Sequence, residues 1–258
     1  AENVMIELLH VEEPLNNSNS TAEENLHQDI DDIFMLKLLE KVNQKISKIT
    51  HHSKFKNVKI KTIVKIGNIY ESIINVIDKE EPDLVIMGAR GINDWDRFLV
   101  GSNTDKIVNS SCSPVLVVHK EDEEINFQNI VFATNNEEDI HKSMGKLKEF
   151  QKLFNAKLHI LRVITLSDFY TTAEAEKDLQ SFALRYDLEN FETHQYNANY
   201  VEEGILQFSQ DNTIDLVSII THKHSLFQRL FSHVSTEVIN HSPKPVSVSY
   251  THLRAHET

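Results

Sequence analysis

Short apolar runs alternate with longer amphipathic segments along this chain. From about Glu24 to Ile49, apolar side chains recur every three or four positions, which predicts a long helix with one face packed on a sheet. Val58 to Val64 alternates apolar and polar residues, which predicts a strand. Strands separated by crossover helices predict an α/β fold with parallel, doubly wound sheets, which bind ligands at the carboxyl ends of their strands.

The same alternation continues to the end of the chain. In the first half, the remaining predicted strands are Met5–Val11, Leu84–Met87 and Val115–Val118, and the remaining helices are Tyr70–Asp78 and Ser102–Asn109. In the second half, the predicted strands are Ile130–Ala133, Leu158–Val163, Glu192–Tyr196, Leu216–Ile220 and Val246–Val248. The helices between them are Ile140–Phe154, Ala173–Tyr186, Val201–Gln210 and Ser235–Asn240.

The two halves repeat one another. Asp83-Leu84-Val85 recurs as Asp215-Leu216-Val217, and the Pro-Val pair at Pro114 recurs at Pro245, so the repeat offset is 131 or 132 residues. This offset is too long for a solenoid and suits a tandem pair of domains. We therefore predict a first domain over residues 1–120, a charged linker over 121–128 and a second domain over 129–248.

Composition narrows the class of protein. The chain has 258 residues, of which 40% are hydrophobic and 25% charged, as expected of a soluble globular protein. Its net charge of −13 argues against non-specific binding to nucleic acid or to an anionic membrane. A single cysteine, Cys112, excludes an internal disulfide framework and favours the cytoplasm, and no apolar run is long enough to span a bilayer.

The most informative segment is glycine-rich. Gly88, Gly91, Gly101 and Ser102 follow the spacing G-x-x-G, nine residues, G-S. An apolar strand leads into the first glycine and a helical pattern leaves the last one. Glycines allow the backbone to approach an anion closely, and a helix N-terminus presents free N–H groups and a positive dipole end. The segment therefore predicts a phosphate-binding loop.

This spacing, with its flanking strands, resembles the nucleotide-binding signature of the universal stress protein (UspA-type) family. The resemblance implies two tandem, Rossmann-like domains and an ATP ligand, with the participation of Mg left open. It also implies that the last strands of the two domains pair across the boundary as an internal pseudo-dimer; a further homodimer stays open. The expected function is an ATP-binding regulatory module of the stress response that acts on an unidentified protein partner.

The resemblance also assigns roles to particular residues. It places the backbone of Gly88 and Gly91 against ribose and phosphates, and Gly101 with the Ser102 and Thr104 hydroxyls at the phosphate tail. Val11 falls where the family contacts adenine, and Arg90 is a candidate cation beside the phosphates. The predicted nucleotide-binding residues are Val11, Gly88, Arg90, Gly91, Gly101, Ser102 and Thr104. The apolar segment Ile92–Val100 is expected to become ordered by nucleotide and to present a partner surface.

Both ends of the chain depart from the family pattern. The first residues, AENVMIELLHV, read as the end of a helix and a buried strand. We therefore expect the first domain to lack its opening strand and helix, including the acidic residue that follows the strand. At the other end, residues 249–258 match no structural pattern and are interpreted as a non-native tail.

The second half has lost the signature. Thr221–His224 stands where G-x-x-G would be, and Ser232-His233 stands where G-S would be. Side chains at these positions block the approach of phosphate, so we expect no nucleotide in the second domain. His222, His224 and His233 fall in one predicted loop, but no cysteine or nearby carboxylate completes a ligand set, so no metal site is predicted there.

No catalytic group is evident. Paired catalytic carboxylates, a Ser-His-Asp order and a Walker P-loop are all missing from the sequence, and Asp94, Asp96 and Asp105 are explained as well by capping and surface charge. The chain is therefore predicted not to be an enzyme. Two alternatives stay open: slow metal-dependent hydrolysis of ATP, and a nucleotide-free protein-interaction module.

Overall fold

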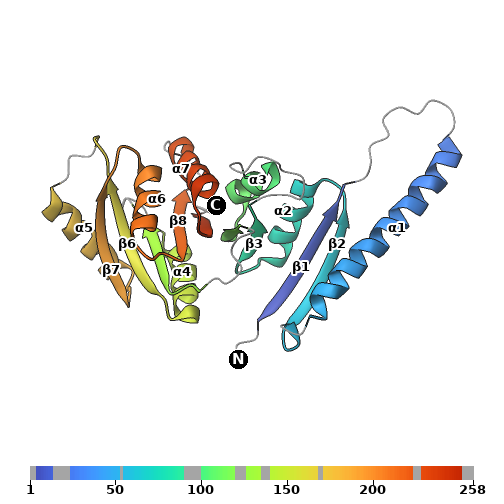
Figure 1. Ribbon diagram of the computed structural model, residues 1–258, viewed down its shortest axis with the longest axis horizontal. Coiled ribbons are helices and arrows are strands. Elements are labelled where there is room, and N and C mark those ends of the chain that lie inside the picture. Colours follow the sequence, from blue (N-terminus) through green and yellow to red (C-terminus); the bar gives the residue numbers. More distant parts are fainter. Residues whose placement is uncertain are drawn as a thin grey trace, which may run out of the picture. The chain divides into compact units, whose positions relative to one another are not determined.

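A computed structural model describes residues 4–13, 24–52, 55–89, 100–119, 126–134, 140–167, 171–222 and 228–251. The strands are β1 (Met5–Glu12), β2 (Lys59–Ile66), β3 (Val85–Gly88), β4 (Val115–Val118), β5 (Asn129–Ala133), β6 (Lys157–Ile164), β7 (Phe191–Asn197), β8 (Leu216–His222) and β9 (Val246–Thr251). The helices are α1 (Glu24–Thr50), α2 (Ile69–Glu80), α3 (Ser102–Ser110), α4 (His141–Phe154), α5 (Thr172–Arg185), α6 (Val201–Asp211) and α7 (Gln228–His241). In these residues, no helix has the length and apolar character that a membrane crossing requires. The alternation of strands and helices confirms the predicted α/β fold (Figure 1).

The chain divides into two compact units, residues 1–75 and 76–258. In the first unit, β1 and β2 form a parallel two-stranded sheet in which Val11 pairs with Lys65. Helix α1 runs over the residues predicted for it. Its Val42 is buried as the periodicity requires, whereas Ile49, in the last turn, is 47% exposed.

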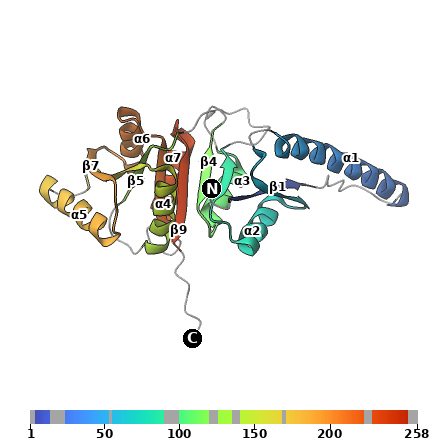
Figure 2. The ribbon, with the colours of Figure 1, turned by 90° about the horizontal axis from the view of Figure 1, so that it is seen from below.

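The second unit is built on one sheet of seven strands in the order β3-β4-β9-β8-β5-β6-β7. Strands β7, β6, β5, β8 and β9 are a complete doubly wound set from the second half of the chain, and all their pairings with one another are parallel. Helices α4 and α5 cover one face of this set and α6 and α7 cover the other (Figure 2). The compact units therefore cut across the sequence repeat, since β3 and β4 of the first half belong to the second unit.

The joint between the halves is the antiparallel pair β4–β9, which confirms that the last strands of the two repeats pair. At its centre Leu116 pairs with Ser247, and these residues are 131 positions apart, the repeat offset itself. A second contact of the same kind joins the Thr236 hydroxyl to Oδ1 of Asp105 at 3.1 Å, again across 131 positions. Residues that meet their own counterparts mark a pseudo-two-fold axis, as in an isologous dimer.

The core of the second unit explains why strands such as β4 and β5 are continuous apolar runs. Ile130, Leu158 and Ile160 are fully buried, and Phe132 stacks on Phe182 of α5 with ring centroids 5.8 Å apart. Leu116 belongs to the same cluster of buried side chains. Strands covered by helices on both faces are expected to read this way, because neither face meets water.

Three predictions about the C-terminal part need correction. Strand β9 does not end at Val248 but continues to Thr251, because Ser249, Tyr250 and Thr251 pair with the last residues of β8. Ser249, Tyr250 and Thr251, which were assigned to a non-native tail because they match no structural pattern, are thus part of the sheet, and residues 252–258 lie outside the described chain. Helix α7 begins at Gln228, seven residues before the predicted Ser235.

The histidines that were predicted to share a loop are also separated. His222 ends strand β8, where it pairs with Thr251, and His233 lies within α7. His224 lies outside the described residues. The predicted common loop is therefore wrong, because long-range pairing with β9 extends β8 into it.

Candidate functional site

The carboxyl end of β3 and the start of α3 form the candidate site. Strand β3 ends at Gly88, which is exposed and pairs with Val118 of β4. Helix α3 starts at Ser102, and its N-cap residue, Gly101, has extended φ and ψ angles of −58° and 140°. No side chain caps this end of α3 within the described chain. The first N–H groups of a helix have no partner inside the helix, so this end presents donors and a positive dipole.

Hydrogen bonds fix the helix start against the strand end. The Thr104 hydroxyl donates to the carbonyl oxygen of Gly88 at 3.0 Å, and Thr104 is only 5% exposed. The Gly101 N–H donates to the carbonyl oxygen of Ala89 at 2.8 Å, and the Ala89 N–H donates to that of Val118 at the same distance. Gly88 and the first turn of α3 are thus held close together by the chain's own hydrogen bonds.

The second half of the chain holds this site from the other side. The Val100 N–H, just before Gly101, donates to Oδ1 of Asn240 on α7 at 2.8 Å. Thr236, one turn earlier on α7, bonds Asp105 in the first turn of α3. These two α7 residues were missed in the sequence, although Thr236 carries one signal: it stands 131 positions, one repeat offset, from Asp105.

The structure places the predicted residues unevenly. Gly88, Gly101, Ser102 and Thr104 are brought together at the end of β3 and the start of α3. Arg90 and Gly91 lie outside the described residues, as does the apolar segment apart from Val100. Val11 lies in the other compact unit, half-buried near the carboxyl end of β1.

Asp105, the carboxylate in the first turn of α3, already accepts hydrogen bonds from other side chains. Oδ1 of Asp105 accepts hydrogen bonds from Thr236 at 3.1 Å and from the side-chain amide of Asn109 at 3.2 Å. Asp105 therefore joins α3 to α7. Asp94 and Asp96 lie outside the described residues.

The equivalent place in the second half is built differently. Strand β8 runs on to His222, whereas β3 stops at Gly88. Ser232, the counterpart of Gly101 one repeat later, lies inside α7, four residues beyond its start at Gln228. The first residue of α3, Ser102, corresponds to His233, five residues beyond the start of α7. Because a helix rises about 1.5 Å per residue, the open N–H groups of α7 are displaced by about 7.5 Å along its axis. The second half has no helix start where the first half has one.

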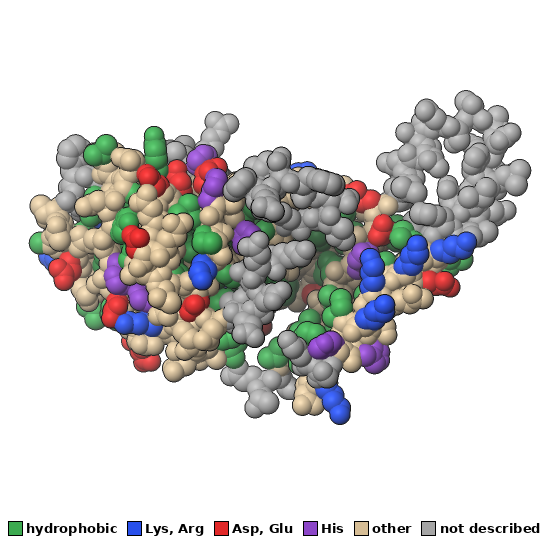
Figure 3. Space-filling view, in the orientation of Figure 1, with side chains coloured by type: hydrophobic (Ala, Val, Ile, Leu, Met, Phe, Trp, Pro, Cys, Tyr) green, Lys and Arg blue, Asp and Glu red, His purple; other side chains and the backbone are tan. Residues whose placement is uncertain are grey.

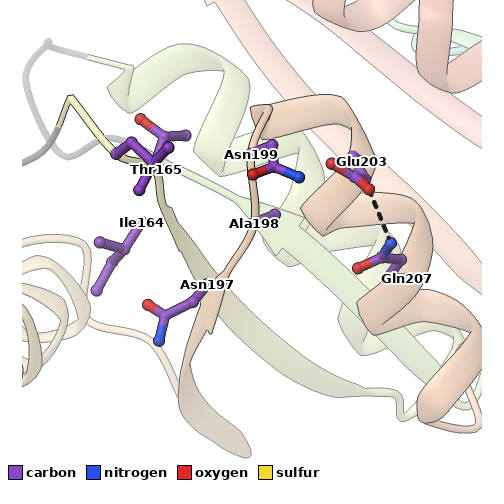
Figure 4. A pocket seen from close by; sticks show the side chains of 8 residues that line it. Ile164, Thr165, Asn197, Ala198, Asn199, Glu203 and Gln207 are labelled. Carbon is purple, nitrogen blue, oxygen red and sulfur yellow. Dashed lines mark hydrogen bonds between the residues drawn. The ribbon is translucent and has the colours of Figure 1, made fainter.

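A pocket of about 460 Å³ lies at the carboxyl ends of β6 and β7, beside α6 (Figure 4). Its described lining carries one charged side chain, Glu203, whose carboxylate accepts a hydrogen bond from Gln207 at 3.1 Å. The other lining residues are Ile164, Thr165, Leu166, Asn197, Ala198 and Asn199. A carboxylate without a described cation beside it does not favour a phosphate ligand.

Comparison with known proteins gives a consistent result. The model of the universal stress protein family matches residues 1–119 and, a second time, residues 126–249. A universal stress protein of Methanocaldococcus jannaschii is 32% identical over 84 residues, which are 33% of this chain and 52% of that protein. One of Synechocystis is 28% identical over 176 residues, 65% of this chain and 58% of that protein. The chain therefore spans little more than half the length of these curated relatives.

Solved structures support the fold. A universal stress protein of Archaeoglobus fulgidus superposes with a TM-score of 0.67 at 20% identity, covering 95% of this chain and 85% of that one. A chain of Pseudomonas aeruginosa described as a putative universal stress protein gives 0.63 at 15% identity, covering 95% and 92%.

Proposed function

The chain belongs to the universal stress protein family, and from this premise we propose that it is an ATP-binding regulatory module. The first repeat holds the nucleotide at the start of α3, and the second repeat serves as a scaffold without nucleotide. The proposal depends on one observation. Helix α3 begins after Gly101 without a side-chain cap, next to the end of strand β3 at Gly88.

The start of α3 suits a phosphate chemically. The phosphate oxygens accept hydrogen bonds from the first N–H groups of the helix, and the helix dipole stabilises their negative charge. The Ser102 side chain is exposed, and its hydroxyl adds a hydrogen-bond donor at the start of α3. Thr104 holds a different role in the proposal: its only hydroxyl proton is given to Gly88, so it positions the loop.

The adenine end of the ligand follows from the family resemblance at Val11, and Arg90 and Gly91 complete the proposed set. Magnesium accompanies ATP as an optional ion, since no residue of the described site is proposed to hold it. The site is proposed not to be catalytic: Asp105, the carboxylate in the first turn of α3, is bound to Thr236 and Asn109. In this proposal, a protein partner distinguishes the chain with bound nucleotide from the chain without it.

An equilibrium titration of the full chain with ATP tests the proposal. We expect one nucleotide per chain, no binding by Gly101→Val, and unchanged binding by Ser232→Val, the same substitution one repeat later. Far-UV circular dichroism shows whether each variant is folded. Equal binding by the wild type and Gly101→Val would refute the proposed site, and phosphate release that is lost in Asp105→Asn would refute the non-catalytic assignment.

A further inference from the structure

A second group of side chains with ligand chemistry lies on the second repeat, toward the amino ends of its strands. His159 is the third residue of β6, and Glu192 and His194 are the second and fourth residues of β7. Because His159 pairs with Glu192 and side chains alternate along a strand, all three share one face of the sheet. One ligand atom from each lies within 4.8 Å of those of the other two. Figure 3 shows histidines gathered over β6 and β7.

The face that carries this cluster is the one covered by α6. The His194 ring lies 5.0 Å, between centroids, from that of Phe208 on α6, and it stacks on His159 at 5.1 Å. His159 is 9% exposed, whereas about half of the Glu192 side chain is open to solvent. The two imidazoles are therefore held in place by packing, and the carboxylate closes the outer side.

The hydrogen bonds define which nitrogen atoms are available. Nε2 of His159 lies 3.2 Å from the amide oxygen of Asn129 on β5. An amide oxygen only accepts, so this nitrogen carries the proton and Nδ1 of His159 keeps its lone pair. That lone pair accepts the hydrogen bond from Nε2–H of His194 at 3.0 Å, so Nε2 of His194 becomes a ligand when its proton is released or moves to Nδ1 of the same ring. A carbonyl partner on the far nitrogen is the usual outer support of a metal-bound histidine.

The two carboxylate oxygen atoms of Glu192 face different neighbours, Lys157 and His194. One oxygen of Glu192 bonds the ammonium group of Lys157, and the other, Oε2, lies 3.8 Å from Nε2 of His194. Oε2 is thus the carboxylate oxygen on the side of the imidazoles. A metal ion binds the neutral form of an imidazole and the ionised form of a carboxylate.

We propose that His159 Nδ1, His194 Nε2 and Glu192 Oε2 form a binding site for one divalent transition metal ion of the zinc type, with a fourth position open to water. Two nitrogen ligands at about 2.05 Å with tetrahedral angles lie about 3.3 Å apart, so the observed 3.0 Å needs a movement of a few tenths of an ångström. Imidazole donors favour Zn²⁺, Cu²⁺ or Ni²⁺ over Mg²⁺ or Ca²⁺.

The first repeat shows that the cluster is not required by the fold. In the first repeat β1 and β2 take the places of β6 and β7, since Val4–Glu12 mirrors Ala156–Ile164 in sequence. The residues at the corresponding register are Glu7 on β1 and Lys61 on β2, which form an ion pair with a 2.6 Å contact. The second repeat has a histidine and a glutamate in their places, and a further histidine two residues on. The site is thus an addition to the second repeat, at the opposite end of its strands from a nucleotide loop.

Metal titration of the full chain tests the site. After treatment with a chelator, we expect the wild type to bind one equivalent of Zn²⁺, to show the visible bands of four-coordinate Co²⁺, and to ignore Mg²⁺. His194→Gln removes a ligand and should abolish the Co²⁺ bands, whereas His51→Gln, an exposed histidine at the end of α1, should keep them.

A second variant separates the site from general damage. Asn129→Ala keeps all three ligands and removes only the partner that orients His159, so Zn²⁺ affinity should fall by about 10–100-fold. Circular dichroism reports whether each variant is folded. Zn²⁺ affinity and Co²⁺ bands that are the same in the wild type and in folded His194→Gln would overturn the proposal.

Discussion

Helices α3 and α7 occupy equivalent places in the two repeats and differ in where they begin. Helix α3 begins directly after Gly101, and α7 begins four residues before the counterpart of that glycine. An early start places the backbone N–H groups at the equivalent positions inside the helix, where they are used by helical hydrogen bonds. The second repeat therefore differs from the first at this place by a longer helix and a longer strand β8, within the same fold.

The two repeats are alike at the other end of these helices. Ser111 at the end of α3 and Ser242 at the end of α7 make the same turn, each hydroxyl donating to a carbonyl two residues on, at 2.7 and 2.8 Å. Each serine oxygen also accepts an N–H, from Ser113 and from Lys244, at 3.1 Å. The two repeats thus share a frame, the strands and the turns after these helices, and differ in the loop before the helices.

The largest expected effect concerns the shared frame. Leu116, 4% exposed at the centre of the β4–β9 joint, packs in the core of the second repeat. We expect Leu116→Ala to lower the free energy of unfolding by about 2–5 kcal/mol, measured by urea denaturation. Leu153→Ala on α4, where the leucine is 58% exposed, should stay within about 0.5 kcal/mol of the wild type. Similar small losses in both would mean that the halves do not share a core.

A pair of glycines tests whether the second repeat kept a tightly packed core after losing the loop. A Cβ at Gly204 on α6 would meet Cγ1 of Val163 at 2.5 Å, whereas one at Gly145 on α4 would meet nothing within 4 Å. Gly204→Ala should cost about 1–3 kcal/mol of stability. Gly145→Ala should add about 0.5–1 kcal/mol, because alanine is the better helix former. Equal thermal shifts in the two variants would contradict close packing of α6 on β6.

The link between the repeats should be visible in nucleotide affinity. Asn240→Ala removes the acceptor of the Val100 N–H, next to Gly101. We expect ATP to bind about fivefold more weakly, as loss of about 1 kcal/mol implies, with the fold unchanged by circular dichroism. His241→Ala, one residue further on α7, is the control, because its ring bonds only its own helix among the described contacts. Unchanged affinity in Asn240→Ala would show that the second repeat does not support the loop.

The smallest expected effect is a pH dependence that arises from two histidines of the second repeat. His159 and His194 have pKa values lowered by burial, with Lys157 and Glu192 as the charged neighbours. The unfolded chain therefore takes up protons first, so stability falls as the pH drops below about 6.5. Urea denaturation at pH 7.5 and 5.5, with a chelator present, should show a smaller acid loss in a folded His159→Gln, His194→Gln double variant. If the wild type and the double variant lost the same free energy of unfolding between pH 7.5 and 5.5, the two histidines would not be the source of this pH dependence.

The sequence was a good guide to everything set by local spacing. The repeat at Asp83 and Asp215, the glycine spacing and the apolar runs of β4 and β9 predicted these strands and the helix after Gly101, and the family resemblance added the pairing of the last strands. These features depend on a few neighbouring residues and on an offset that can be read directly.

What the sequence could not show depends on contacts between distant residues. Strand β9 extends to Thr251 because β8 lies beside it, and Asn240 reaches Val100 across 140 positions. The cluster of His159, Glu192 and His194 needed the register of β6 and β7. Its sequence signal was weak: Glu192 and His194 stand at alternate positions of one predicted strand and His159 lies in another, and such polar residues are easily taken for a solvated face.

Amide hydrogen exchange with and without ATP tests the central difference between the repeats most directly. The account predicts that ATP slows exchange in peptides covering Val100 to Asp105, at the start of α3, and leaves peptides covering Gln228 to Thr236, at the start of α7, unchanged. Slowed exchange at α7, or binding of ATP without any slowing at α3, would contradict it.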